Sequence, residues 1–391
     1  MNVNDIQLYH NSFVSLHVQL HHQVQQLILS GRWMYGTRLP SENQLTSHLK
    51  ISRSTVRLAL QQIEIEGLIE RIPGKGTFVA YQPSQGNRAQ LIAFVTSDFN
   101  DAKALNLLNG AEDEMKTSGY RIMFSNAQNY REEIELLTRF QAENVAGVLI
   151  WPNSDYGNGE IREQHIKNYQ SVQLPLVFLD RNIERVDSDC VTSDNYGGAS
   201  ALMQHLVELG HQHIAFVVHS KLDLMPVMER YRAYQEVMWK AGLTPVDPWI
   251  IGDGNGEING NHALRSSTDH NSLELQQIKN YLLNAPHRPT AIFAINDFLA
   301  ILTMRVMKFL GIKVPDEISI AGFDDIDLAS HLEIPLTTVA QHPFEIGKRA
   351  ARRLIDRLEG YNGPTSCEII STQLRVRSST SLGYVPDGYN P

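Results

Sequence analysis

Three segments decide the fold of residues 1–80: Leu39-Pro-Ser-Glu42, Ser52-Arg-Ser-Thr-Val-Arg57 and Gly74-Lys-Gly-Thr-Phe-Val79. Ser41 and Ser52 are suited to cap two helices, over residues 42–49 and 53–66, because a serine hydroxyl accepts a hydrogen bond from a first-turn amide. Gly67 ends the second of these helices. The short link at residues 50–52 is typical of the turn in a helix-turn-helix.

Apolar residues on either side complete this small domain. Before it, Leu16, Leu20 and Val24 recur at helical spacing, which predicts a helix over residues 16–30. After it, the pattern predicts strands over residues 68–72 and 77–80, joined by a turn at residues 73–76. The glycines on both sides of Lys75 allow the backbone of this hairpin to approach a phosphate or a minor groove.

The second capped helix carries groups that suit DNA. Arg53 and Arg57 lie on one face at helical spacing, and Ser54 and Thr55 lie in its first turn. Hydroxyls and a helix N-terminus can contact phosphates, and arginines can read base edges in the major groove. Two arginines on one helix usually mark an ordinary solvated face. The basic hairpin that follows favours the DNA interpretation.

Composition bounds the rest of the chain. The 391 residues fit two or three domains, and the hydrophobic share of 42% is ordinary for globular proteins. The net charge of −9 argues at first against a nucleic-acid partner. Residues 1–80, however, contain seven Lys and Arg against five Asp and Glu. Because phosphate affinity depends on a local patch, an acidic remainder does not exclude DNA binding.

Cys190 and Cys367 match no metal or redox spacing and are interpreted as ordinary reduced cysteines. The N-terminus lacks the pattern of a signal peptide. No stretch approaches the roughly 20 apolar residues that a membrane span needs. We therefore expect a cytoplasmic protein with no membrane partner.

Residues 14–80 resemble the winged helix-turn-helix domain of the GntR family of bacterial transcription regulators, through the three segments quoted above. The resemblance implies that Arg38, Arg53, Thr55, Arg57 and Gly76 contact operator DNA, and Lys75 is added on its charge alone. Ser41, Glu42 and Ser54 complete the predicted DNA-binding set. One departure is that Lys50-Ile51 stands where the family usually has Gly-Val.

Residues 81–90 are polar and contain Pro and Gly, which is typical of a linker. Beyond them the sequence alternates between apolar runs and amphipathic stretches, which predicts an α/β domain with a doubly wound parallel sheet. The expected strands are 91–96, 120–125, 147–151, 176–179, 214–218, 249–251, 291–294 and 318–321. Helices are expected over 105–117, 132–143, 198–209 and 298–310, with a further one from 272.

Polar clusters follow several of these strands, where parallel sheets bind ligands. They are Asp98-Phe99, Trp151, Asp180-Arg181, Asn296-Asp297 and Asp324-Asp325, with Arg230 expected to start a helical stretch after the strand at 214–218. Carboxylates can grip the vicinal hydroxyls of a sugar and an aromatic face can cover its ring. Any one of these residues fits a capping role equally well. Five clusters together favour a ligand site.

Residues 91–381 resemble the effector domain of the LacI/GalR family, which is similar to periplasmic sugar-binding proteins. The marks include Val177-Phe-Leu-Asp-Arg181, Arg230-Tyr-Arg-Ala-Tyr234 and Val314-Pro-Asp-Glu-Ile-Ser-Ile-Ala-Gly-Phe-Asp-Asp325. The resemblance implies two lobes joined by crossovers near residues 192, 342 and 365. Lobe 1 would span 91–192 and 343–364, lobe 2 would span 193–342 and 366–380, and 382–391 would be a tail.

The same resemblance implies ligand contacts at six positions, and three neighbours in the same clusters join the predicted set. The predicted effector-binding residues are Asp98, Phe99, Trp151, Asp180, Arg181, Arg230, Asn296, Asp297 and Asp324. The glycine-rich stretch 252–260 lacks the ending of a phosphate loop and the spacing of a calcium loop, so it is interpreted as an enlarged surface loop that extends to about 270.

A GntR-type head on a LacI-type body resembles the arabinose-responsive repressors. We expect a homodimeric repressor of carbohydrate-utilisation genes that a monosaccharide such as arabinose releases from double-stranded operator DNA. A ligand-dependent activator, or a corepressor-type regulator that senses a sugar acid, an amino sugar or a nucleoside, fits the same pattern. No catalytic motif, metal site or cofactor is expected, so an enzyme is disfavoured. His21 and His22 on the first helix are interpreted as surface residues.

Overall fold

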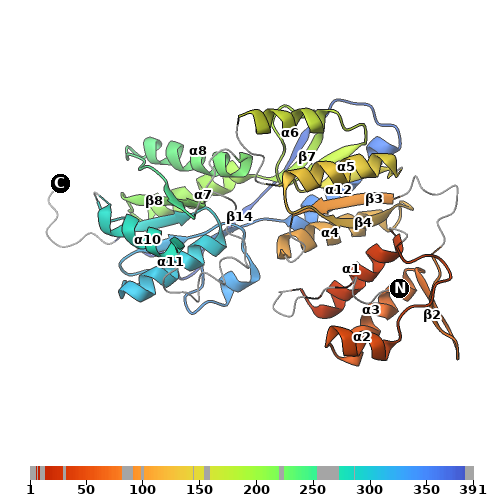
Figure 1. Ribbon diagram of the computed structural model, residues 1–391. Helices are drawn as coiled ribbons and strands as arrows, with labels where there is room; N and C mark the ends of the chain where they lie inside the picture. Colours follow the sequence, from red (N-terminus) through yellow and green to blue (C-terminus); the bar gives the residue numbers. More distant parts are fainter. Residues whose placement is uncertain are drawn as a thin grey trace. The chain divides into compact units, whose positions relative to one another are not determined.

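The chain forms two compact units in the computed structural model (Figure 1). Unit 1 comprises residues 1–179, 183–189 and 347–366, and unit 2 comprises residues 180–182, 190–346 and 367–391. The structure describes residues 6, 8, 14–29, 32–81, 91–97, 101–143, 145–153, 159–219, 224–252, 273–285 and 287–383. Most of the predicted linker and the predicted loop at 253–270, Asp98, Phe99 and most of the predicted tail lie outside these residues.

The N-terminal part of unit 1 is a small helical domain with a hairpin, which we call the head. It contains α1 (Leu16–Leu29), α2 (Glu42–Leu49), α3 (Arg53–Ile65) and the antiparallel pair β1 (Ile69–Ile72) and β2 (Gly76–Val79). Leu20, Val56 and Ile63 are completely buried where the helices meet. The predicted winged helix-turn-helix is therefore confirmed.

The rest of unit 1 contains four parallel strands in the order β6-β5-β3-β4, which belong to a sheet of six. Their bounds are β3 (Leu91–Thr96), β4 (Arg121–Asn126), β5 (Gly147–Ile150) and β6 (Leu176–Leu179). Three helices alternate with these strands along the chain: α4 (Ala102–Met115), α5 (Tyr130–Ala142) and α6 (Glu160–Gln170). A fourth, α12 (Pro343–Leu358), returns from late in the sequence and packs on α4, where Lys348 pairs with Asp113 at 3.0 Å.

Unit 2 contains a second parallel sheet, in the order β11-β10-β8-β9. Its strands are β8 (Ile214–His219), β9 (Trp249–Ile251), β10 (Ala291–Ala294) and β11 (Ser319–Ala321). Two pairs of helices accompany the sheet, as Figure 1 shows: α7 with α8 and α10 with α11. Their bounds are α7 (Asn195–Glu208), α8 (Met225–Lys240), α10 (Leu273–Asn284) and α11 (Asp297–Leu310).

Two further strand pairs and one short helix in unit 2 were not predicted. β7 (Asp189–Ser193) pairs with β13 (Cys367–Ile370) in parallel, and β12 (Thr338–Ala340) pairs with β14 (Gln373–Arg375) in antiparallel. A short 3-10 helix, η3, spans Asp327–Ser330. The prediction that Arg230 starts a helical stretch was wrong, because α8 begins one turn earlier, at Met225-Pro226. Pro at the first helical turn needs no amide donor, which explains the earlier start.

The two parallel sheets and the head confirm the predicted fold class. Within the part of the chain that the structure describes, no helix combines the length and apolar character of a membrane span.

Candidate nucleic-acid interface and effector site

Two serines set the geometry of the helix-turn-helix. Ser41 caps α2 in a capping box with Gln44, in which each residue's side chain bonds the other's backbone amide. Ser52 caps α3 and accepts from the amide of Thr55 at 3.1 Å. The link between the helices passes through Lys50, which adopts the left-handed conformation with φ of 54°. This conformation favours glycine, so the sequence tolerates strain at the position where the family usually has Gly.

Arg57 projects from α3 into solvent and is held by one carboxylate. Its side chain is 63% exposed, and its guanidinium lies 3.2 Å from Glu42 of α2. The other oxygen of Glu42 lies 3.6 Å from Arg71 of β1, and Arg71 also pairs with Glu64 at 3.0 Å. Glu42 of α2 therefore links α3 to the hairpin. An exposed pair of this kind contributes little stability, so the arginine can exchange its partner for a phosphate or a base.

The N-terminal end of α3 gathers three more of the predicted DNA-binding residues, Arg53, Ser54 and Thr55. Arg53 donates from Nε to Asn43 Oδ1 at 3.0 Å, which orients its guanidinium beside α2. The hydroxyls of Ser54 and Thr55 each lie 2.7 Å from the hydroxyl of Ser52. A hydroxyl cluster at a helix N-terminus, with arginines beside it, suits a phosphate backbone.

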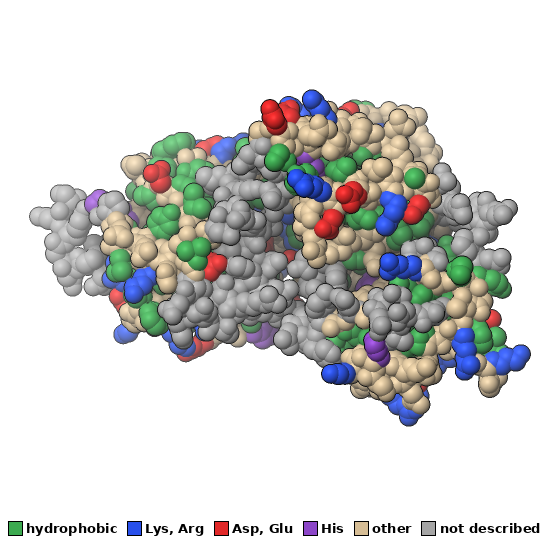
Figure 2. Space-filling model, viewed as in Figure 1, with side chains coloured by type: hydrophobic (Ala, Val, Ile, Leu, Met, Phe, Trp, Pro, Cys, Tyr) green, Lys and Arg blue, Asp and Glu red, His purple; other side chains and the backbone are tan. Residues whose placement is uncertain are grey.

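The hairpin completes this surface. Lys75 is exposed at its tip, and Figure 2 shows Lys and Arg side chains gathered on the outer surface of the head in the region of α2 and β2. Gly76 has φ of +121°, and a Cβ added there would lie 2.7 Å from Nε of Arg38. Glycine at this position is therefore favoured by the backbone conformation, and a larger residue would also displace the end of the Arg38 side chain. All nine predicted DNA-binding residues lie on the head.

In unit 2, Arg230 of α8 is the centre of a buried polar cluster. The residue is 6% exposed, and its guanidinium stacks 3.7 Å from the centroid of the Phe323 ring. Nε donates to Asn195 Oδ1 at 2.9 Å and Nη1 donates to the Ile295 carbonyl at 2.6 Å. Nη2 lies 3.8 Å from Asp324. These contacts fix the guanidinium in one orientation.

Asp324 lies on a loop with an unusual backbone. Asp324 and Asp325 both have positive φ, of 123° and 55°. The side-chain amide of Gln341 donates to Asp324, and Gln341 in turn accepts from Ser193 at 2.7 Å. Asp325 pairs with Arg377 at 2.6 Å. Non-glycine residues with positive φ often mark functional sites, because the surrounding structure must stabilise the strained loop.

Asn296 and Asp297 are adjacent but have different surroundings. Asn296 caps α11 and its amide nitrogen lies 3.2 Å from Nε2 of His219 at the end of β8. Asp297 is completely buried and accepts from Thr338 Oγ1 at 2.5 Å and from the Ile326 amide at 2.9 Å. Burial, and next the charge of Asp324, raise the pKa of Asp297 to about 7. These contacts make Asp297 a support for the Asp324 loop.

The other predicted effector residues lie at strand ends. Asp180 and Arg181 follow β6 and are both buried, and Asp180 has φ of 66°. The Asp180 amide donates to the Val191 carbonyl at 2.7 Å. Trp151 follows β5 in unit 1, where Nζ of Lys103 lies 5.3 Å from its ring.

Four cluster residues escaped the sequence interpretation: Asn195, His219, Phe323 and Gln341. Phe323 lies inside the segment Val314–Asp325 quoted above, and Asn195 ends Val191-Thr-Ser-Asp-Asn195, which also resembles the LacI/GalR family, so the signal was present in their position. Gln341 follows β12, a three-residue strand that the pattern does not reveal. The only signal for His219 is its place at the end of a predicted strand.

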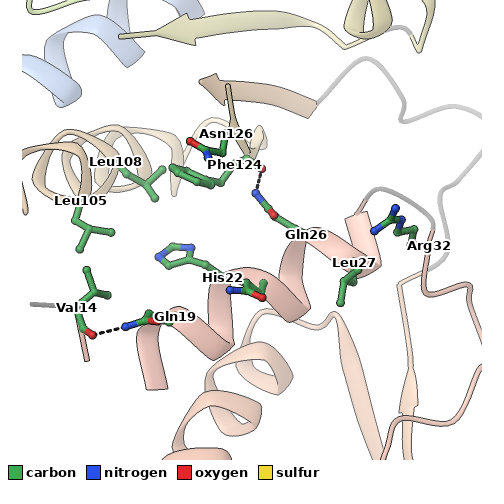
Figure 3. A pocket seen from close by; sticks show the side chains of 11 residues that line it. Val14, Gln19, His22, Gln26, Leu27, Arg32, Leu105, Leu108, Phe124 and Asn126 are labelled. Carbon is green, nitrogen blue, oxygen red and sulfur yellow. Dashed lines mark hydrogen bonds between the residues drawn. The ribbon is translucent and has the colours of Figure 1, made fainter. Parts of the chain in front are cut away.

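The interpretation of His21 and His22 as surface residues was wrong. His21 is 9% exposed and its Nε2 lies 2.6 Å from Glu66, while burial and then the charge of His21 lower the pKa of His22 to about 4. The reason is that α1 has a second packed face, where the Gln26 amide donates to the Phe124 carbonyl. A cavity of about 180 Å³ lies on this face. Figure 3 shows the side chains that line it, most of which come from α1, α4 and β4.

Comparison with known proteins adds family matches to this geometry. Residues 16–79 match the family described as bacterial regulatory proteins of the gntR family, and residues 203–380 match the periplasmic binding protein-like domain. The head and most of unit 2 are thus covered by two separate families.

Two curated proteins are similar to this chain along nearly their whole length. The arabinose metabolism transcriptional repressor of Geobacillus stearothermophilus is 29% identical over 369 residues, which cover 93% of this chain and 97% of the relative. The repressor of the same name from Halalkalibacterium halodurans is 28% identical and covers 92% and 95%. A solved transcriptional regulator CelR–cellobiose complex has a similar fold, with a TM-score of 0.62, 23% identity and coverage of 84% and 92%.

Proposed function

We propose that this chain, which carries a GntR-family helix-turn-helix domain and a periplasmic-binding-protein-like domain, is a repressor that leaves its operator DNA when a monosaccharide binds. The observation that carries the proposal is the contrast in one chain between exposed arginines on a capped recognition helix and a buried arginine fixed beside a carboxylate. The first arrangement suits a polyanion and the second suits a small polyol.

The head supplies the DNA-binding half of the function. α3 would enter the major groove, where Arg53 and Arg57 reach base edges while Ser54 and Thr55 contact phosphates. Lys75 at the tip of the hairpin would contact the backbone beside the groove. Because Glu42 holds Arg57 only through an exposed ion pair, DNA can displace that carboxylate at a small free-energy cost.

Unit 2 supplies the sensing half. Arg230 presents fixed N–H donors, Asp324 presents acceptor oxygens, and Asn296 can provide both donors and acceptors. Neighbouring hydroxyls of a sugar need this mixture, since each hydroxyl donates one hydrogen bond and accepts others. Arabinose is the first sugar to test, because both similar repressors are named for arabinose metabolism.

Release would follow from a population shift in a homodimer. Two heads bind half-sites about one helical turn of DNA apart, so their spacing must match the operator. A sugar that binds one conformation of the sensing domain more tightly shifts the dimer toward that conformation and away from the operator spacing. We also propose that neither a metal nor a cofactor takes part.

A titration of purified full-length protein against duplexes from its own genomic neighbourhood tests the proposal. We expect one duplex to bind at least about 10³-fold more tightly than random DNA. A monosaccharide, arabinose first, should weaken that binding, and a chelator should change neither curve. The repressor assignment fails if every sugar leaves the affinity unchanged. A sugar that tightens binding would instead indicate the corepressor-type regulator.

A further inference from the structure

The two cysteines of the chain are neighbours in space although they are far apart in sequence. β7 and β13 pair in parallel with a register that places Cys190 opposite Cys367. Paired strands lie about 4.7–4.9 Å apart, and disulfides join Cα atoms separated by roughly 4.4–6.8 Å. In a parallel pair, side chains at matched register point to the same face of the sheet. The backbone therefore brings the two thiols within bridging range.

Hydrogen bonds immediately before the cysteines keep the two strands from slipping. The Asp189 carboxylate accepts from the Ser366 amide at 3.0 Å and from Nε of Arg357 at 2.6 Å. Thr365 donates its hydroxyl to Asp187. A change of register by one residue would break these bonds and turn one cysteine to the opposite face. The Cys190–Cys367 alignment is thus built into the fold.

The two thiols differ in access. Cys367 is exposed, whereas Cys190 is 2% exposed, and both are reduced in this structure. A small oxidant can reach Cys367 first, because exposure and thiolate character decide which cysteine reacts. Cys190 is shielded from bulk oxidant but lies beside the sulfur that reacts. This is the arrangement of an attacking cysteine and a resolving cysteine.

We propose that Cys190 and Cys367 are a redox modification site that a low-molecular-weight disulfide converts to an intrachain disulfide. The Cys367 thiolate attacks one sulfur of the reagent, forms a mixed disulfide and releases one thiol. The Cys190 thiolate then attacks the Cys367 sulfur, forms the Cys190–Cys367 bond and releases the second thiol. Two electrons pass from the protein to the reagent, and the two cysteine protons balance the two released thiols.

The bond is expected to be easily reversed. At matched register the two Cβ atoms lie about one strand spacing apart, which exceeds the roughly 3.5–4.5 Å that a relaxed disulfide spans. Closing the bridge must draw the strands together, and strained disulfides are reduced more readily. A disulfide between Cys190 and Cys367 therefore suits a reversible response to redox conditions better than a permanent structural role.

The position of the pair gives the bond a consequence for sensing, which rests on the proposed function. Cys190 and Cys367 are each the first residue of unit 2 after a segment of unit 1, so a bridge would tie two of the connections between the units. If effector binding moves the units, a tie between these connections opposes that movement. Oxidation should then weaken effector binding.

Peptide mapping tests the bond itself. We expect oxidised glutathione to convert the full-length protein to a form that lacks two hydrogen atoms, with the peptides of Cys190 and Cys367 joined. The matched variant Cys190→Ser should stop at a glutathione adduct on Cys367, and Cys367→Ser should remain unmodified. A wild-type protein that stops at the adduct, or that links two chains through Cys367, would overturn the proposal.

Effector titrations test the consequence separately. Oxidised wild type should bind its sugar about fivefold or more weakly than reduced wild type, the lower end of usual allosteric couplings. The same treatment of Cys367→Ser should change nothing. Equal affinities with the bond present would remove the sensing role and leave the modification site. If no sugar binds in either state, the proposed function fails and the peptide map still stands.

Discussion

Two arginines show how differently the head and unit 2 use the same side chain. Arg57 is 63% exposed and has one ion pair at 3.2 Å, whereas the Arg230 side chain is 7% exposed and has bonds to a side-chain amide and a carbonyl. DNA brings its own dense charge, so a head arginine must remain free to move. A sugar brings only weak dipoles, so unit 2 must fix its donors in advance.

The largest effect is expected for Arg230→Ala, which tests whether the buried arginine stabilises unit 2 and an exposed one does not. Removal of a buried, bonded guanidinium takes one partner each from Asp324 and Asn195 and opens a gap in the buried cluster, so the free energy of unfolding of unit 2 should fall by about 3–5 kcal/mol. Hydrogen exchange of β8 and α8 measures that fall. Arg232→Ala is the matched control, because Arg232 lies on the same helix with a side chain that is 63% exposed. A comparable loss in the control would contradict the distinction.

The second test uses pH. Burial raises the pKa of Asp297 to about 7, so the folded state holds a proton that the unfolded carboxyl, with its usual pKa of 3.8, releases. Unit 2 should therefore lose stability as the pH rises between about 4 and 7, by as much as roughly 2–4 kcal/mol. Asp297→Asn should flatten this dependence in urea unfolding at a series of pH values. An unchanged slope would show that Asp297 titrates normally.

A smaller effect, confined to DNA, is expected for Arg57→Ala. Operator binding should weaken by about 1–3 kcal/mol with relaxed specificity, while the free energy of unfolding changes by less than about 0.5 kcal/mol and sugar binding is retained. Arg352→Ala is the control, since the Arg352 side chain is also 63% exposed but lies outside the head. A mobility-shift titration with equal affinity for wild type and Arg57→Ala would refute the assigned role of Arg57.

The smallest change should follow Lys75→Ala. A lysine that contacts only phosphate weakens all sequences alike, so the ratio of operator to random affinity should stay constant. The slope of log affinity against log salt should become shallower by about 0.9. A loss of affinity for the operator but not for random DNA would instead indicate that Lys75 contacts a base edge.

Much of the fold is readable from local signals. Ser41 and Ser52 fix where α2 and α3 begin, and the strands β3, β6, β9 and β10 have the predicted bounds because each is a continuous apolar run. β12, β13 and β14 have three or four residues each and escape the pattern. These strands form because they pair with segments that are distant in the sequence. Local periodicity in the sequence does not reveal such pairing.

The candidate site likewise contains residues that the sequence predicts and contacts that it does not. Residue type and position at a strand end suffice to nominate Arg230 and Asp324. They cannot show that Asp297 faces inward to Thr338 while its neighbour Asn296 caps the helix. Nor can helical spacing reveal that α1 has a second packed face, which is why His22 was assigned to the surface. The surroundings of Asp297 and the error for His22 both concern which side of an element is covered, a property of tertiary packing.

Glu42 gives the head an internal competitor for DNA. Its two oxygens pair with Arg57 and Arg71, as the oxygens of a phosphate can. Any duplex must displace this carboxylate from the arginines. A random sequence can compensate only with phosphate contacts, whereas an operator adds contacts to its base edges. We expect the acid to lower the affinity for DNA that offers only phosphate, by a small amount because the Glu42–Arg57 pair is exposed.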